Sequence, residues 1–145
     1  MSAMRKVGSS SVWAVVSALA VMAGCTAMGM GSSSRLELTG AQEVPPVTTA
    51  ASGSGTITVA ADKSISGSVT TSGVAGTAAH IHDGAAGKNG PVIIPLTKTS
   101  DNSWSVPAGT KLTDAQYDSY KAGNLYVNVH SAANKGGEIR GQLKP

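Results

Sequence analysis

The sequence has a single cysteine, Cys25, so the chain cannot form a disulfide bond within itself. Aromatic residues make up only 3% of the chain, and no cluster of lysine and arginine contains aromatics between its charges. Such a cluster is typical of nucleic-acid-binding proteins, so we expect no nucleic-acid partner. The domain must be held together by packing, with or without a metal ion.

Two common catalytic motifs are also missing. Serine is abundant, but no Gly-x-Ser-x-Gly segment occurs, which is the turn that carries the nucleophile of many hydrolases. The glycine-rich segment 84–89 lacks the spacing and the Ser/Thr of a phosphate-binding loop. The sequence therefore leaves open whether the protein is an enzyme.

The N-terminus has the pattern of a secretion signal. Arg5 and Lys6 precede an apolar run over residues 12–23, which is shorter than a membrane-spanning helix requires. The run ends in Met22-Ala23-Gly24-Cys25, which resembles a lipoprotein cleavage motif with Met in place of the usual Leu. We predict that residues 1–24 are a lipoprotein signal peptide and that Cys25 is lipidated. Ordinary secretion with an unmodified cysteine is the alternative.

The predicted cleavage changes how the charge and the location are interpreted. Nine basic and eight acidic residues remain, so the sequence pI of 9.2 says little about partners. The residue after Cys25 is Thr26 and not Asp, which favours the periplasmic face of the outer membrane. Residues 25–34 are small and rich in Gly and Ser, typical of a flexible tether, and we expect the domain to occupy residues 35–145.

Most of the remaining chain alternates between apolar and polar residues, which predicts β-strands. Residues 55–60 and 64–70 read as a hairpin, with Ile57, Val59, Ile65 and Val69 on one face. One helix is predicted over residues 114–122, between Thr113 and Gly123. Seven or eight short strands with frequent Gly and Pro turns predict an all-β, antiparallel Greek-key (Ig-like) β-sandwich with one short helix.

All three histidines lie in two of the predicted strands. His80 and His82 share one strand face, opposite Ile81. In the strand at residues 125–130, His130 lies opposite the apolar face formed by alternate residues. If both apolar faces enter the core, all three imidazoles leave it on the same side and can bind one metal ion. Neutral imidazole suits copper, zinc, iron and nickel, and Cu(I) storage through sulfur is disfavoured because the domain has no thiolate and no nearby methionine cluster. Three unrelated surface histidines are the alternative.

Three other polar residues stand near the histidines in the sequence. Asp83 and Glu138 are candidates for orienting the histidines or for ordinary surface charges. Arg140 is a candidate for pairing with a surface acid or for guiding an anion to a metal.

Three segments resemble the CHRD (chordin-type) domain. They are residues 38–46, residues 79–84 together with 90–92, and residues 125–130 together with 136–143. The resemblance runs from about residue 36 to residue 143, nearly the whole predicted mature chain. It implies a family more than a mechanism.

The order of His80, His82, late His130 and then Arg140 is also similar to the copper half of the Cu,Zn superoxide dismutases, which are Ig-like Greek-key sandwiches. This similarity implies copper ligation by the three histidines, with zinc less favoured, and an anion-guiding Arg140. The zinc-site histidines, a fourth copper histidine and the disulfide cysteines are missing here.

Two functions follow as expectations. In the first, a lipid-anchored envelope domain binds copper through its three histidines, for copper handling or superoxide-type redox chemistry. In the second, the domain is a non-enzymatic β-sandwich module that binds a protein or polysaccharide partner.

Overall fold

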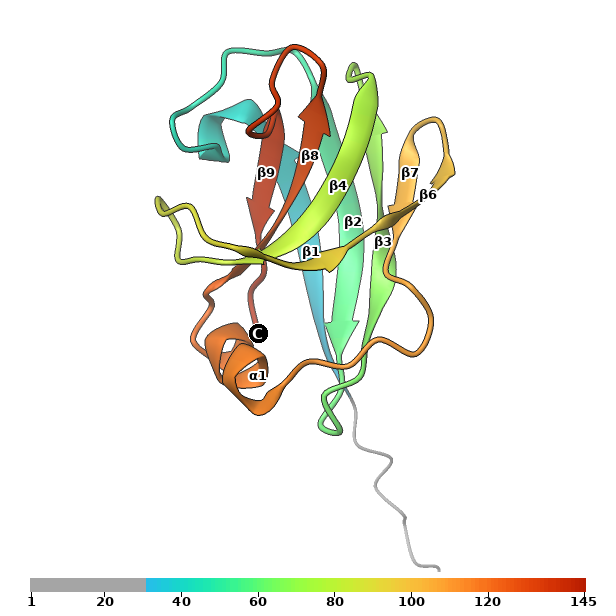
Figure 1. Ribbon diagram of the computed structural model, residues 1–145, viewed down its shortest axis with the longest axis vertical. Coiled ribbons are helices and arrows are strands. Elements are labelled where there is room, and N and C mark those ends of the chain that lie inside the picture. Colours follow the sequence, from blue (N-terminus) through green and yellow to red (C-terminus); the bar gives the residue numbers. More distant parts are fainter. Residues whose placement is uncertain (1–30) are drawn as a thin grey trace, which may run out of the picture.

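The computed structural model describes residues 31–145 (Figure 1). The predicted signal peptide, Cys25 and most of the predicted tether lie outside the described residues. Strand β1 begins at Ser32, so the end of the segment assigned to the tether belongs to the folded domain. Within the described part of the chain, no helix is long and apolar enough to cross a membrane.

The described residues form nine strands, one α-helix and one 3-10 turn. In chain order these are β1 (Ser32–Thr39), η1 (Gly40–Gln42), β2 (Ser52–Val59), β3 (Ile65–Ser72), β4 (Gly76–Asp83), β5 (Val92–Pro95), β6 (Thr97–Ser100), β7 (Ser103–Ser105), α1 (Asp114–Lys121), β8 (Leu125–Ser131) and β9 (Ile139–Gln142). The predicted all-β class with one short helix is confirmed. The strand that the sequence did not indicate is β6, whose four residues are all exposed and carry no apolar face.

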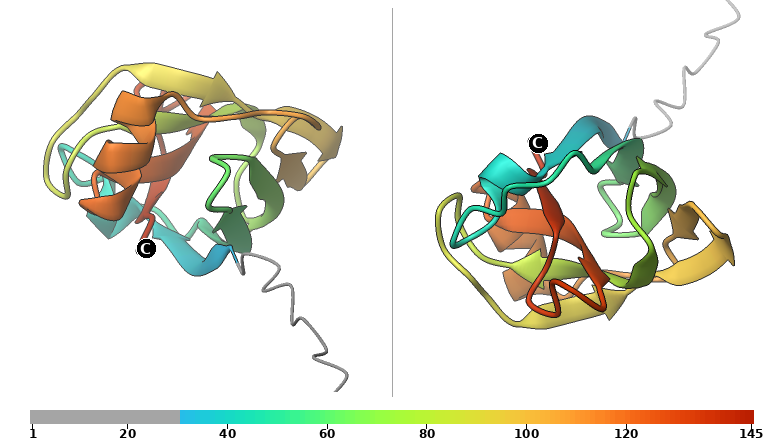
Figure 2. Two further views of the ribbon diagram at one scale, coloured as in Figure 1. Left: turned by 90° about the horizontal axis from the view of Figure 1, so that it is seen from below. Right: turned by 90° about the horizontal axis from the view of Figure 1, so that it is seen from above.

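The strands form one antiparallel sheet in the order β5-β4-β8-β9-β1-β2-β3-β7-β6. Its first and last strands, β5 and β6, are separated in the chain only by Leu96. The two ends of the sheet therefore come together, and the strands surround a common interior (Figure 2). The predicted sandwich is built from a single curled sheet.

The hairpin of β2 and β3 follows the predicted pattern. The two strands pair without a break from Ser52↔Ser72 to Val59↔Ile65. Ile57, Val59, Ile65 and Val69 are all buried, as predicted. Each such side chain contributes about 1.5–3 kcal/mol to folding by leaving water.

The helix starts and stops where the sequence indicates. Thr113 Oγ1 accepts a hydrogen bond from the Gln116 backbone N–H, and Gln116 Oε1 accepts one from the Thr113 N–H. This reciprocal cap satisfies two N–H groups that the first turn leaves free. Gly123 takes a positive φ of 75°, which ends the helix before β8.

The pairing of β4 with β8 gives the domain two differently used faces. Ile81 pairs with Val127, and both are fully buried in the core with Leu125 and Val129. Alternate residues on the same strands point the other way. That outer face carries the histidines.

Candidate metal centre

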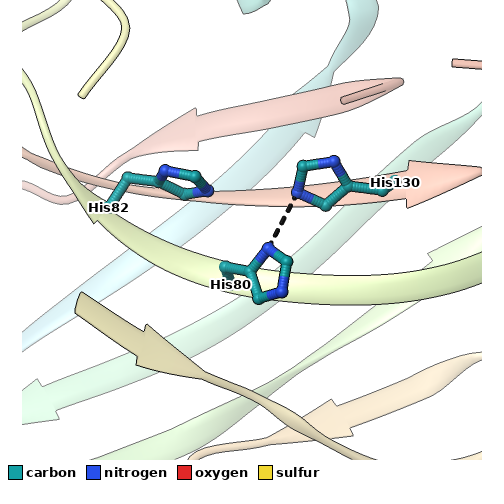
Figure 3. A group of neighbouring side chains, drawn as sticks. All are labelled: His80, His82 and His130. Carbon is teal, nitrogen blue, oxygen red and sulfur yellow. Dashed lines mark hydrogen bonds between the residues drawn. The ribbon is translucent and has the colours of Figure 1, made fainter. Parts of the chain in front are cut away.

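The three histidines meet on the outer face of β4 and β8 (Figure 3). His80 and His82 come from β4 and His130 from β8. One nitrogen of each ring lies within 4.8 Å of the others, and His80 Nδ1 is 3.0 Å from His130 Nε2. Ligands on one ion at about 2 Å each are at most about 4 Å apart, so a small rotation of the rings completes a three-nitrogen set. The predicted convergence of the imidazoles is confirmed.

Backbone carbonyls orient two of the three rings. His82 Nδ1 lies 2.9 Å from the Gly90 oxygen, and His130 Nδ1 lies 2.9 Å from the Lys135 oxygen. A carbonyl oxygen only accepts, so each Nδ1 carries the proton and each Nε2 keeps its lone pair. In His130 that lone pair accepts a hydrogen bond from His80 Nδ1. Metal-binding histidines are held in this way, with the non-ligating nitrogen donating to a fixed oxygen.

The Nε2 atom of His82 has no hydrogen-bond partner among the described residues. It is fully enclosed, and the residue as a whole is only 8% exposed. A buried polar atom without a partner costs about 1–3 kcal/mol, so such atoms are rare without a reason. A metal ion bound to this nitrogen would provide the missing partner.

The surroundings favour the neutral form of two of the histidines. Burial, and then the neighbouring His130 and His82, lower the pKa of His80. Burial also lowers the pKa of His82, more than the Gly90 carbonyl raises it. Metal ligation requires the neutral imidazole, so these shifts favour the ligating form at neutral pH.

Comparison with known proteins identifies the family. The family model of the CHRD domain matches residues 35–143, most of the chain. The chain belongs to the CHRD-domain family. Comparisons with curated proteins and with solved structures found no match. The resemblance to the family seen in the sequence is therefore confirmed.

Tyr126 is a neighbour of the histidine cluster that the sequence did not single out. Its ring stacks on His82, with 4.8 Å between the ring centroids and 4° between their planes. Its hydroxyl oxygen accepts a hydrogen bond from the Gly90 N–H at 3.2 Å. Tyr126 shares the outward-facing positions of β8 with His130, and this shared face is the signal that could have identified it.

Arg140 of the CHRD domain is buried, not paired with a surface acid. It is 1% exposed, and its Cζ lies 3.4 Å from the centroid of the Tyr126 ring. The guanidinium donates hydrogen bonds to the Ala85 carbonyl, Gln142 Oε1 and Asn89 Oδ1. His82 on β4 and Arg140 on β9 thus approach Tyr126 from the strands on either side of β8. The anion-guiding role stays a prediction.

The two acidic candidates do not orient the rings. Glu138 accepts a hydrogen bond from Thr49 Oγ1 at 2.8 Å. The backbone carbonyls of Gly90 and Lys135 make the orienting hydrogen bonds for which Asp83 and Glu138 were candidates. Sequence patterns identify carboxylates readily, but a backbone carbonyl becomes a ligand-orienting group only through the conformation of its loop.

Proposed function

We propose that this CHRD domain binds one copper ion through His80, His82 and His130. The observation that supports this most strongly is the orientation of the rings. Two imidazoles donate Nδ1–H to backbone carbonyls and thereby keep Nε2 as the unprotonated nitrogen, in a cluster that His80 completes.

Copper is the metal that best fits the donor set. For nitrogen ligands the affinity of divalent first-row metals rises to Cu(II) and falls at Zn(II). All three donors of the cluster are imidazole nitrogens. We therefore place copper first and zinc second.

Three protein nitrogens leave room for a further ligand on the ion, which is the arrangement of catalytic and transfer sites more than of closed structural ones. We propose copper handling or redox chemistry on a small oxygen species as the role. In the redox case Arg140 would act as the anion guide.

The proposed location is the periplasmic face of the outer membrane, with the domain anchored by lipid on Cys25. The support is the motif that ends at Cys25 and the Thr26 that follows it. Replacing Cys25 with Ser should move the protein from the membrane fraction to the soluble fraction. Retention of the variant in the membrane fraction would contradict the lipid anchor.

The direct experiment is a copper titration of the purified protein, followed by EPR and thermal unfolding. We expect one equivalent of Cu(II) with nitrogen hyperfine structure. A ligand at 100 times its Kd should raise the stability by about 2.7 kcal/mol. His82→Ala should lose most of the binding, and Asn102→Ala, an exposed change outside the cluster, should retain it.

The result also separates the two functions that the sequence left open. If the signal is absent, or is the same in His82→Ala, the copper proposal is wrong. A domain that unfolds at the same temperature with and without every divalent ion tested would be the interaction module instead.

A further inference from the structure

Asn128 is a further polar residue of the face that carries the histidines. It lies on β8 midway between Tyr126 and His130, and its register partner on β4 is His80. Alternate residues of a strand share a face, so Asn128 points outward with Tyr126 and His130. It is nevertheless only 2% exposed. A buried amide beside three converging imidazoles is a candidate for contact with the ion that they would bind.

Two acceptors lie next to the amide nitrogen of Asn128. Nδ2 donates to the Gly136 carbonyl at 3.4 Å. A Cβ added to Gly137 would collide with both Nδ2 and Glu43 Oε1, so the Glu43 carboxyl stands beside the same nitrogen. The oxygen and nitrogen of an Asn side chain are assigned from such partners. Acceptors at one end of the amide identify that end as the nitrogen and the other end as the oxygen.

The amide oxygen lies near a second acceptor that also lacks a partner. Asn128 Oδ1 and His82 Nε2 are both enclosed, and neither has a hydrogen-bond partner among the residues that the structure describes. Burial lowers the pKa of His82, while the Gly90 carbonyl and the Asn128 amide raise it, which places this amide beside the ring. Because His82 Nδ1 donates to Gly90, Nε2 carries a lone pair and no proton. Two buried acceptors without a donor destabilise the fold unless a cation lies between them.

A metal ion on the histidine cluster would satisfy both atoms. An ion bound to His82 Nε2 lies about 2 Å from that nitrogen, on the side where the neighbouring amide oxygen can reach it. Cu(II) takes nitrogen and oxygen ligands in tetragonal arrangements. Three imidazoles and one amide oxygen supply four ligands to such an ion, and its axial positions stay open to a small oxygen species.

We propose that Asn128 Oδ1 is a fourth ligand of the metal ion, and that Glu43 and the Gly136 carbonyl hold the amide in the ligating orientation. This inference rests on the copper site proposed above and adds an oxygen to its three nitrogens. Glu43 is then a positioning residue, since it acts on the ion only through Asn128.

The test is pulsed EPR of the Cu(II)-loaded protein, labelled with ¹³C at the side-chain carbonyl carbon of asparagine. An amide oxygen bound to copper transmits an isotropic ¹³C coupling through the Cu–O bond, so we expect this coupling in the wild type. It should vanish in Asn128→Leu, which has a similar shape and no oxygen. Cu(II) affinity, measured by competition with a chelator, should fall by about 10- to 100-fold in this variant. Asn102→Leu, the same change at an exposed position, should keep both the coupling and the affinity.

A double variant tests the pairing of Asn128 with Glu43. Asn128→Asp/Glu43→Gln exchanges the amide and carboxyl groups, so an oxygen still faces the histidines and an amide nitrogen stands behind it. The oxygen now belongs to a carboxylate, so Cu(II) should bind at least as tightly as in the wild type. The asparagine ¹³C coupling should be absent, which also identifies its source if Asn128→Leu folds poorly.

The outcomes separate this inference from the copper proposal. If the wild type binds no Cu(II), or His82→Ala binds it equally well, the copper site is wrong and the fourth ligand is wrong with it. If the wild type binds Cu(II) through His82 but shows no isotropic ¹³C coupling, the fourth ligand alone is overturned. A coupling that persists in the double variant overturns it as well.

Discussion

The His82 and Tyr126 rings lie parallel, 4.8 Å apart, and both contact the same glycine. His82 Nδ1 donates to the Gly90 oxygen, and the Gly90 N–H donates to the Tyr126 hydroxyl. One residue of the loop after β4 thus fixes both side chains. The tautomer and the direction of His82 therefore depend on a loop that contains no metal ligand.

Tyr126→Phe tests this dependence. The variant keeps the ring that stacks on His82 but leaves the Gly90 N–H without its acceptor, so the loop should hold the imidazole less firmly. Loss of such an orienting contact lowers metal affinity by about 10- to 100-fold. We expect the loss of copper affinity to be near the lower end of that range, about 10-fold, measured by competition with a chelator. Tyr117→Phe, on α1, is the matched control and should leave the affinity unchanged. Equal affinities in both variants would show that Tyr126 only packs.

Gly90→Ala should disturb both the fold and the cluster. A Cβ at this position would lie 1.7 Å from the Asp83 backbone oxygen, so the loop must shift. Overpacking of this kind costs about 1–3 kcal/mol. We expect a lower free energy of unfolding in urea and weaker copper binding. Gly136→Ala, where the Cβ would have no neighbour within 4 Å, is the control and should behave like the wild type.

The histidines should make the metal-free protein sensitive to acid. Burial lowers the pKa values of His80 and His82, so the folded state binds fewer protons than the unfolded state. Stability should therefore be greatest above the unfolded pKa near ~6.5 and fall as the pH drops below it. Thermal unfolding between pH 5 and 8 with a chelator present measures this. The double variant His80→Asn/His82→Asn should show a flatter profile below pH 6.5. An unchanged slope would contradict the assignment.

Glu43 should act in the opposite direction. Its pKa is raised from 4.5 to about 7, so the folded state holds the proton more tightly. The contribution of Glu43 to the stability of the fold is greatest at low pH and is lost as the pH rises through about 7. Replacing Glu43 with Gln removes this loss. The melting temperature of Glu43→Gln relative to the wild type should therefore rise between pH 5 and 8. Asn102→Ala, an exposed change that removes no titratable group, should show no such trend.

Much of the architecture could be predicted from the sequence because alternation reports directly which face of a strand is buried. Ile57 and Val59 are buried as predicted, and Ile81 and Val127 are buried opposite the histidines. The three imidazoles converge because the same alternation places them on the face opposite the core. Strand β6 could not be predicted, because its exposed Thr and Ser residues give no apolar signal and its pairing with β7 depends on the rest of the sheet.

The burial of Arg140 and Glu43 could not be predicted either. Arg140 is buried because the loop at residues 84–91 folds over the outer face of β9 and supplies oxygens for its guanidinium. Glu43 lies in a segment with little regular structure between η1 and β2 and is nevertheless buried. Strand periodicity says which way a side chain points, but not whether a loop then covers it.

The short link between β5 and β6 also bears on self-association. Unpaired sheet edges recruit other chains into aggregates unless they are short, charged or interrupted by proline. In the described residues the outermost strands of the sheet are β5 and β6, each only four residues long, with Pro95 ending β5 and Lys98 within β6. Leu96 alone separates these strands, and β5 pairs with β4 while β6 pairs with β7. A mutation that releases the crossing would therefore expose the edges of β4 and β7 at once. We therefore expect the crossing from β5 to β6 to protect the domain against aggregation by covering these strand edges.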